Sequence, residues 1–466
     1  MASKPNFVQI SEAQFRTNFS DLHPPLGDNA AVVEASRCLF CFDAPCTIAC
    51  PTHIDVPKFI KKIATRNVHG SARTILEANI LGASCAKVCP VDVLCEGACV
   101  MNHHNEKPIQ IGLLQRYAMD WADQRDYQPF AAGNPNGKKV ACIGGGPASL
   151  ACAAELAQMG YDVTIYERKP LAGGLNTYGI AEYKLTPKDA VRETERVRHL
   201  GVKFECGVEV TDHIGEATGK AKAPATQRSI SFRELEDQYN AVFIGIGLGE
   251  TLDLKIPGED LGGVVDALSF IEEYKTRRTK CRVGKRVAVI GAGNTAVDAA
   301  TAAARLGAAE VRMVYRRSEK EMPAFAYEYE LAKRDGINFN WLTQPVRIHG
   351  KKHVEKLECV RMELGKPDKT GRRRPEPVPR SKFFIECDMV IKSLGQTKFE
   401  GFLQGILHLN RAKDGRVMVD EMTYQTSNPK YFAGGDCING GQEVVDAVAD
   451  GKKAAHGIHG WIQGLG

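Results

Sequence analysis

The stretch Lys139-Val-Ala-Cys-Ile-Gly-Gly-Gly-Pro-Ala-Ser-Leu150 joins a short apolar run to three glycines and an alanine-rich segment. The apolar run predicts a buried strand, and the segment after the glycines predicts a helix. Gly144 allows a tight turn, and Gly146 lets the backbone approach a pyrophosphate at the helix N-terminus. Ser149 takes the third small position, where the helix packs closely on the strand. The stretch therefore predicts the first turn of a dinucleotide-binding fold.

Two further features indicate that this dinucleotide is FAD. The next strand-like run ends in Glu167, and a carboxylate at that point hydrogen-bonds ribose hydroxyls. Near the C-terminus, a strand-like run ends in Gly435-Asp436, and a helix is predicted from Val444 to His456. Asp436 can bond the ribityl chain of a flavin, and the helix can aim its N-terminus at the pyrimidine edge of the flavin ring.

A second strand, glycine turn and helix follow at Lys285-Arg-Val-Ala-Val-Ile-Gly-Ala-Gly-Asn-Thr-Ala296. Its next strand ends in Arg316-Arg317 and not in an acid. Arginines can pair with the 2′-phosphate of NADPH, whereas a carboxylate would repel it. We therefore expect NADPH in preference to NADH. The second fold interrupts the first, which is the layout of flavin reductases with two dinucleotide folds.

Eight of the fifteen cysteines lie between residues 38 and 99. The first four, Cys38 to Cys50, are separated by two, four and three residues and are followed by a proline. This spacing suits [4Fe-4S] clusters, which need four soft ligands at their corners. From spacing alone, all eight cysteines are candidate ligands of two clusters. Eight thiols could also hold two zinc ions in a binding module, but the link to two dinucleotide folds favours electron transfer.

Length and composition set the outer bounds. The 466 residues are enough for about three domains. The expected fold class is an α-helical domain with two [4Fe-4S] clusters at 1–134, followed by two Rossmann-like α/β domains. The FAD-binding domain is expected at 135–246 plus 396–466, and the NAD(P)H-binding domain at 247–395. A net charge of +5 is too small to indicate nucleic acid. The absence of a signal peptide and of an apolar stretch of ~18 residues indicates a cytoplasmic protein with no membrane partner.

The chain resembles the dihydropyrimidine dehydrogenase family, both its N-terminal half and its bacterial flavin–iron–sulfur subunit, and more distantly the small subunit of glutamate synthase. The resemblance runs from Leu26-Gly-Asp-Asn-Ala-Ala-Val-Val-Glu-Ala-Ser-Arg-Cys38 to the last helix. Its most discriminating segment is Pro108-Ile-Gln-Ile-Gly-Leu-Leu-Gln115, because the pyrimidine enzymes have a ligating glutamine where glutamate synthase typically has a glutamate. The implied ligands are Cys38, Cys41, Cys46 and Cys99 for one cluster, and Cys50, Cys89, Cys95 and Gln115 for the other.

The resemblance makes Cys85 a spare buried thiol, whereas spacing alone makes it a ligand. The resemblance also implies which positions contact each nucleotide. The implied FAD contacts are Gly144, Gly146, Pro147, Ala148, Ser149, Glu167, Leu175, Lys184, Val210, Gly435, Asp436 and Val444. The implied NAD(P)H contacts are Ala292, Gly293, Asn294, Thr295, Arg316, Arg317, Ser393 and Gly395.

Two positions depart from the pyrimidine enzymes. Lys184 stands where the family has an arginine, so the positive charge is kept but the planar fork is lost. Pro323 stands where the mammalian enzyme has a further arginine, which weakens the expectation of NADPH.

The function implied by the resemblance is electron input to a dihydropyrimidine dehydrogenase. NAD(P)H is oxidised at FAD, and two [4Fe-4S] clusters relay electrons to an FMN-containing (β/α)₈-barrel partner that interconverts uracil or thymine and the 5,6-dihydropyrimidine. No side chain is required as a catalytic acid or base, because the cofactors carry the chemistry. One alternative is a glutamate synthase small subunit or a related NAD(P)H oxidoreductase. A disulfide reductase is disfavoured because Cys281 stands alone near the second fold.

Overall fold

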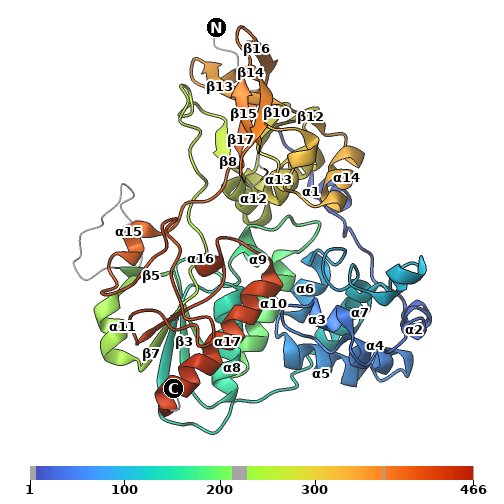
Figure 1. The fold of residues 1–466 in the computed structure, drawn as a ribbon, viewed down its shortest axis with the longest axis vertical. Coiled ribbons are helices and arrows are strands. Elements are labelled where there is room, and N and C mark those ends of the chain that lie inside the picture. Colours follow the sequence, from blue (N-terminus) through green and yellow to red (C-terminus); the bar gives the residue numbers. More distant parts are fainter. Residues whose placement is uncertain (1–6, 212–227, 370, 372, 465–466) are drawn as a thin grey trace. The chain divides into compact units, whose positions relative to one another are not determined.

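The computed structural model describes residues 7–211, 228–369, 371 and 373–464, which form two compact units (Figure 1). The smaller unit contains the described residues of Met1–Leu22, Tyr178–Tyr183 and Glu250–Thr397. The larger unit contains those of His23–Thr177, Lys184–Gly249 and Lys398–Gly466. Among the described helices, none has the length and apolar character needed to cross a membrane.

The larger unit contains a five-stranded parallel sheet in the order β18-β7-β2-β3-β4. The central strand is buried from Val140 to Ile143, because both faces of a parallel sheet are covered. Its outer strand β18 comes from the C-terminal stretch and pairs with β7. The strands are β2 (Lys139–Ile143), β3 (Asp162–Glu167), β4 (Lys203–Cys206), β7 (Ala241–Ile244) and β18 (Tyr431–Ala433), with a separate parallel pair β5 (Val208–Thr211) and β6 (Arg228–Ser231).

Helix α17, also from the C-terminal stretch, packs along α8 on this sheet (Figure 1). A Cβ atom on Gly451 of α17 would lie 2.1 Å from the carbonyl oxygen of Ala148 in α8. A glycine at this point therefore allows the two helices to approach closely. The helices of this part are α8 (Pro147–Gln158), α9 (Leu175–Tyr178), α10 (Pro187–Arg198), α11 (Phe232–Gln238), α15 (Glu400–Leu403), α16 (Asp436–Asn439) and α17 (Val444–Gln463).

The segment from residue 23 to 127 of the larger unit is helical, as the sequence predicts. Side-chain caps start two of its helices: Asp55 accepts from the Lys58 N–H at 3.1 Å, and Asn67 accepts from the Gly70 N–H at 2.9 Å. One short helix, α6, packs against α10 and α17 of the sheet-containing part. The helices are α2 (Asp28–Ser36), α3 (Pro45–Ile48), α4 (Val56–Ala64), α5 (Val68–Ala78), α6 (Gly82–Val88), the 3₁₀ turn η1 (Val100–His104) and α7 (Ile111–Gln124).

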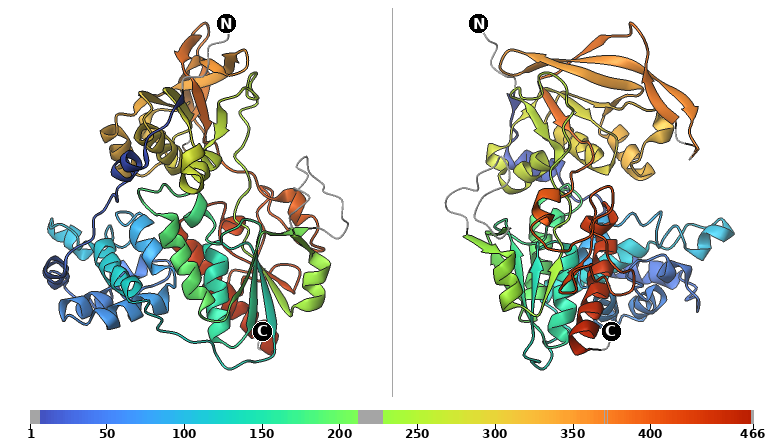
Figure 2. Two further views of the ribbon diagram at one scale, coloured as in Figure 1. Left: turned by 180° about the vertical axis from the view of Figure 1, so that it is seen from behind. Right: turned by 60° about the vertical axis from the view of Figure 1, so that its left-hand side comes forward.

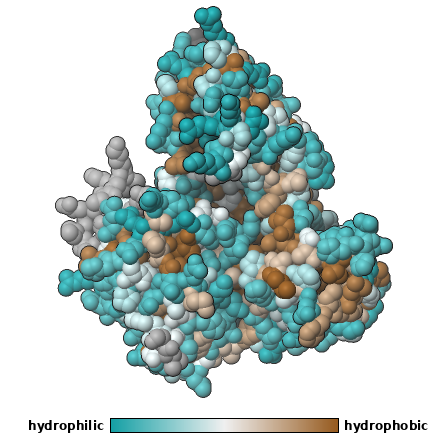
Figure 3. Space-filling view, viewed as in Figure 1, coloured by the Kyte–Doolittle hydropathy of each residue, from teal (hydrophilic) through white to brown (hydrophobic). Residues whose placement is uncertain are grey.

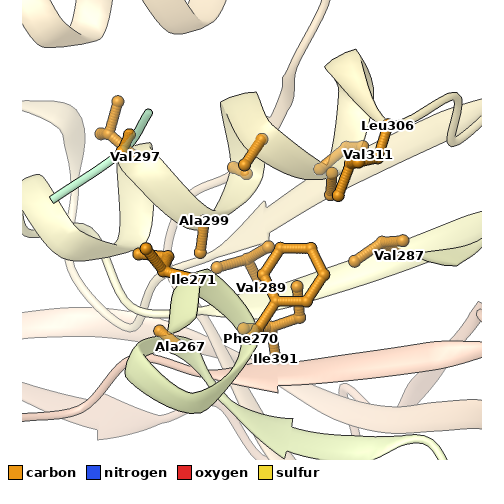
Figure 4. Close-up of a cluster of buried hydrophobic side chains, with 14 of the residues drawn as sticks. Ala267, Phe270, Ile271, Val287, Val289, Val297, Ala299, Leu306, Val311 and Ile391 are labelled. Carbon is orange, nitrogen blue, oxygen red and sulfur yellow. The ribbon is translucent and has the colours of Figure 1, made fainter. Parts of the chain in front are cut away.

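The smaller unit has a second parallel sheet, in the order β12-β11-β10-β17-β8. Figure 4 shows its core, where Phe270 and Ile271 of α12 meet Val289 of β10 and Val297 of α13. The strands are β8 (Val264–Asp266), β10 (Arg286–Ile290), β11 (Glu310–Val314), β12 (Asn338–Asn340) and β17 (Met389–Lys392). The helices are α12 (Ala267–Thr276), η2 (Arg278–Lys280), α13 (Asn294–Arg305), η3 (Glu319–Glu321) and α14 (Ala326–Arg334).

A twisted antiparallel sheet completes the smaller unit, and Figure 2 shows its long strands in the right-hand view. Its strands are β13 (Thr343–Gly350), β14 (Val354–Pro367), β15 (Arg373–Pro377) and β16 (Phe383–Glu386). The predicted fold class, a helical domain followed by two Rossmann-like α/β folds, is confirmed.

The N-terminal residues differ from their predicted place in the helical domain. Helix α1 (Glu12–Asn18) packs in the smaller unit, and β1 (Phe7–Val8) pairs there with β9 (Val283–Gly284). Phe15 and Phe19 stack with ring centroids 4.2 Å apart, and the Phe19 ring lies 5.3 Å from that of Tyr274. Buried aromatic contacts, which helical spacing cannot reveal, assign this helix to the second nucleotide fold.

The close approach of α17 and α8 leads to a prediction about Gly451. We expect Gly451→Ala to destabilise the protein by about 1–3 kcal/mol, because the new methyl group meets the backbone of Ala148. Gly460→Ala is the matched control, since it lies in the same helix and a Cβ there meets nothing within 4 Å. This control should be neutral or stabilising by up to about 1 kcal/mol. Thermal unfolding followed by circular dichroism measures both changes, and equal effects at the two positions would contradict the packing argument.

Candidate functional site

The first glycine turn lies beside the carboxylate of Glu167. Gly144 has a φ of +89° and donates its N–H to the carbonyl of Tyr166 at 2.8 Å. The Gly145 N–H donates to Oε2 of Glu167 at 2.8 Å, and the Lys169 N–H donates to Oε1 at 2.8 Å. The predicted ribose-binding acid is therefore held at the end of β3, directly next to the turn.

The N-terminus of α8 has the open geometry that a pyrophosphate requires. No side chain caps this helix, and the space beside Gly146 is open, because a Cβ atom on that glycine would have its nearest neighbour 3.9 Å away, at Gly174. Pro147 occupies the first helical position, Ala148 is buried, and Ser149 is fully buried next to Gly245. Uncapped N–H groups at a helix N-terminus bind anions, so these residues fit an FAD pyrophosphate.

The C-terminal residues of the predicted FAD site lie at the same turn. Gly435, with a φ of +76°, is packed so that a Cβ there would lie 3.1 Å from the Cβ of Ala148. The Asp436 carboxylate accepts from the Gln442 N–H at 3.1 Å, and burial raises its pKa. Val444 begins α17, where Glu443 and Asp446 form a capping box, so part of this N-terminus is already occupied by the chain's own carboxylates.

Three other predicted FAD residues lie outside this turn. Leu175 begins α9 and is 39% exposed, Lys184 is half-buried, and Val210 is buried in β5. Asp450 was not predicted from the sequence, yet it accepts from the Gly435 N–H at 3.0 Å and from the Tyr424 hydroxyl at 3.0 Å. In the sequence, Asp450 could have been noticed only as an acid directly before Gly451.

The second glycine turn has the same construction. Gly291 has a φ of +138° and donates its N–H to Val314 at 3.1 Å, and a Cβ there would lie 2.2 Å from the carbonyl oxygen of Ser393. Gly293 has open space around it at the uncapped N-terminus of α13. The remaining predicted residues surround this turn or follow β17: Ala292, Asn294, Thr295, Ser393 and Gly395.

The two arginines that follow β11 differ in exposure. Arg316 is exposed, whereas Arg317 is half-buried and its Nε has no hydrogen-bond partner within the described residues. Neither arginine has an acidic partner in the part of the chain that the structure describes. An unpaired guanidinium beside a dinucleotide turn fits the 2′-phosphate of NADPH.

The structure gathers the cysteines into two groups. Cys38, Cys41, Cys46 and Cys99 line one apolar pocket, together with side chains such as Val56 and Ile60. Cys50, Cys85, Cys89 and Cys95 lie close enough for their charges to interact, and burial raises the pKa of the Cys95 thiol. Soft sulfur donors in apolar surroundings fit iron–sulfur clusters, whose binding displaces the thiol protons.

Gln115 and Cys85 both lie on or against α6. Gln115 is 8% exposed, and its Nε2 donates to the carbonyl of Gly82 at 2.8 Å. Cys85 is 3% exposed, and its Sγ accepts from Nδ2 of Asn79 at 3.2 Å. Hydrogen bonding with the Cys85 thiol is the largest cause that raises the pKa of Cys89. Both candidates for the fourth ligand of the second group therefore lie at α6.

The two cysteine groups differ from a site that binds a single metal ion, in which the ligand atoms converge on one point. Within the described ranges of the chain, no three His, Cys, Asp or Glu side chains converge as ligands of one ion. Ligands of a cubane surround an inorganic core and do not meet at one ion.

Two family profiles match the chain. The profile described as dihydropyrimidine dehydrogenase domain II, 4Fe-4S cluster, matches residues 15–127, and that of pyridine nucleotide-disulphide oxidoreductase matches residues 138–451. The predicted cofactors, FAD, [4Fe-4S] clusters and a nicotinamide nucleotide, are confirmed at this level.

Two relatives that match over nearly their whole length differ in function. The glutamate synthase [NADPH] small chain of Escherichia coli is 34% identical, over 96% of this chain and 95% of the relative. The NAD-dependent dihydropyrimidine dehydrogenase subunit PreT homolog of Salmonella typhi is 32% identical, over 95% of this chain and 97% of the relative.

The solved structure of Mycobacterium tuberculosis FprA in complex with NADPH shares the fold, with a TM-score of 0.55 and 19% identity over 71% of this chain and 86% of that one. The chain therefore belongs to the pyridine nucleotide-disulphide oxidoreductases, in the group that carries an N-terminal 4Fe-4S domain, and it is an NAD(P)H-dependent FAD and iron–sulfur oxidoreductase subunit.

Proposed function

We propose that this chain is the electron-input subunit of a dihydropyrimidine dehydrogenase. Its partner is an FMN-containing (β/α)₈-barrel subunit that interconverts uracil or thymine and the 5,6-dihydropyrimidine, in a hetero-oligomer. The observation that carries the proposal is the position of Gln115. Its amide nitrogen donates to the carbonyl of Gly82, the first residue of the helix that leads to Cys89, which leaves Oε1 as the atom available to a metal.

When bound, FAD accepts hydride from the nicotinamide and releases electrons singly to the clusters. The chain's own residues bind and orient these groups. We propose that Glu167 holds the ribose of FAD and that Gly146 to Ser149 hold its pyrophosphate, while Gly293 to Thr295 hold the pyrophosphate of NADPH. The cluster ligands are Cys38, Cys41, Cys46 and Cys99 in the first set, and Cys50, Cys89, Cys95 and Gln115 in the second.

The arrangement of the larger unit supports an order for the two ligand sets. Helix α6, which ends at Val88 directly before Cys89, packs against α10 and α17 of the FAD-binding part. This packing supports the proposal that the second set lies on the side of the helical domain that adjoins the flavin fold. We propose that electrons reach this set first and the Cys38 set afterwards.

The surface beside the cysteines supports a partner protein. Figure 3 shows apolar residues gathered over the helical part of the larger unit. Large exposed apolar side chains occur within two positions of candidate ligands, and Phe42 is 100% exposed. The others of this kind are Leu39, Ile48 and Val93. Exposed apolar patches mark interaction sites.

A glutamate synthase small subunit is the second candidate. The similarity to the E. coli small chain, 34% against 32% for the PreT homolog, does not separate the two functions. Gln115 favours the pyrimidine enzyme, because the glutamate synthase subunit typically has a glutamate there.

A reconstitution experiment tests the function. The purified chain should reduce ferricyanide with NAD(P)H but should not reduce uracil. Adding the FMN subunit of a bacterial dihydropyrimidine dehydrogenase should restore uracil reduction, while adding the large chain of glutamate synthase should not yield glutamate. Reduction of uracil by the chain alone, or coupling only with the glutamate synthase large chain, would refute the proposal.

A second prediction concerns the choice of nicotinamide. Charge-assisted hydrogen bonds contribute about 1.5–3 kcal/mol, so Arg317→Gln should lower kcat/KM for NADPH by about tenfold or more and leave that for NADH unchanged. Arg312→Gln is the control, because Arg312 lies on β11, the strand that precedes Arg317, but is paired with Glu310. A wild-type preference for NADH would show that the arginines do not select the phosphate, and Pro323 would then be the position to examine.

A third prediction separates Gln115 from Cys85. Cys85→Ala should retain about eight irons per chain, from two four-iron clusters, although it leaves the Asn79 amide without its acceptor. Gln115→Ala should lose or alter the second cluster, as seen by iron analysis and electron paramagnetic resonance of the reduced protein. The opposite pattern, with iron lost only from Cys85→Ala, would make all eight cysteines the ligands.

A further inference from the structure

Glu193 is a buried carboxylate that joins α10 of the FAD-binding part to α6 of the helical part. It is 1% exposed. Its Oε1 accepts from the N–H groups of Ala83 at 2.9 Å and Ser84 at 3.0 Å, and its Oε2 accepts from the Ser84 hydroxyl. One side chain of the flavin fold therefore holds the first turn of the helix that leads to Cys89.

The same turn orients Gln115. The carbonyl of Gly82 accepts from Nε2 of Gln115 at 2.8 Å, and Gly82 directly precedes the two residues that donate to Glu193. A shift of this turn would therefore move both Gln115 and Cys89, which are two of the four proposed ligands of the second cluster.

The charges around Glu193 leave its own charge without a direct partner. The nearby cation Arg196 donates to Asp123 of α7 at 2.7 Å, and Lys87 of α6 pairs with Asp189 of α10 at 2.7 Å. Among the described residues, no Lys, Arg or His nitrogen lies within ion-pair distance of the Glu193 carboxylate. A buried carboxylate without a direct cation is costly, and a neutral glutamine could make equivalent hydrogen bonds. Anchoring alone does not require the charge.

We propose that Glu193 is a positioning residue of the second cluster: it fixes α6, which leads to Cys89 and contacts Gln115, and its negative charge lowers the reduction potential of that cluster relative to the first. This inference rests on one part of the proposed function, namely that the chain binds two clusters. It requires no particular partner or substrate. A negative charge fixed near a cluster disfavours addition of an electron, and local charge is one of the levers that set cluster potentials.

Two substitutions separate charge from geometry. Glu193→Gln keeps the length and the acceptor oxygen and removes the charge, and the Ser84 hydroxyl can turn to accept from the new amide. Glu193→Asp keeps the charge but is too short to reach both N–H groups. Glu195→Gln is the matched control. It removes the same charge from the same helix, but at a side chain that is 47% exposed.

The experiment is a redox titration of the purified full-length protein followed by electron paramagnetic resonance, with iron analysis of each variant. Burial raises the pKa of Glu193 to about 7, so the titration is run well above that pH, where the wild-type group is charged.

We expect the Glu193→Gln variant to retain its iron. The reduction potential of its second cluster should rise by about 59 mV, which is a tenfold change in the one-electron reduction equilibrium. The first cluster and Glu195→Gln should keep wild-type values, and Glu193→Asp should lose iron from the second cluster. Unchanged potentials in Glu193→Gln, or loss of its iron, would overturn the proposal. Wild-type protein without iron would instead overturn the proposed function.

Discussion

The contact between α8 and α17 at Gly451 is the constraint on which the flavin fold depends. Both helices begin beside the predicted FAD site, because α8 follows the Gly144 turn and α17 follows the segment of Gly435, which lies next to Ala148 at the start of α8. A glycine at the crossing lets α17 lie directly on the backbone of Ala148, and Asp450, the neighbouring residue, reaches back to the Gly435 N–H. One helix therefore packs on the first nucleotide fold and holds the Gly435 turn of the predicted FAD site.

A set of buried polar contacts joins the helical part to this fold. Arg196 pairs with Asp123, and Glu193 accepts from two backbone N–H groups of α6. Buried ion pairs add little net stability, because the desolvation of both charges offsets their attraction. Breaking one partner is nevertheless costly, so such contacts specify a single arrangement of the two parts. A relay of electrons needs this property, since it depends on fixed separations between cofactors.

The sequence predicted the features that local patterns encode. Two glycine turns, each between a buried strand and an alanine-rich helix, indicated both nucleotide folds, and the acid at Glu167 lies where the pattern predicted. The cysteine spacing indicated a metal-rich helical domain. The residues that carry long-range contacts had no such signal. Phe15 meets Tyr274 far along the chain, so α1 packs in the smaller unit, which the local pattern does not indicate. Likewise, nothing near Glu193 in the sequence points to Ser84. Gln115 was found only through a family resemblance, because a single amide has no characteristic spacing.

Helix α6 shows why these long-range contacts matter for the proposed clusters. It has seven residues, and a helix of that length is not stable alone in water. Its geometry therefore comes from the side chains that hold it: Glu193 at its first turn, Asn79 at Cys85, and Asp189 at Lys87. Two of these three belong to α10 of the flavin fold. The proposed ligands next to α6 consequently take their positions only when the flavin fold is formed. The nucleotide fold and the second proposed ligand set therefore form one cooperative structure.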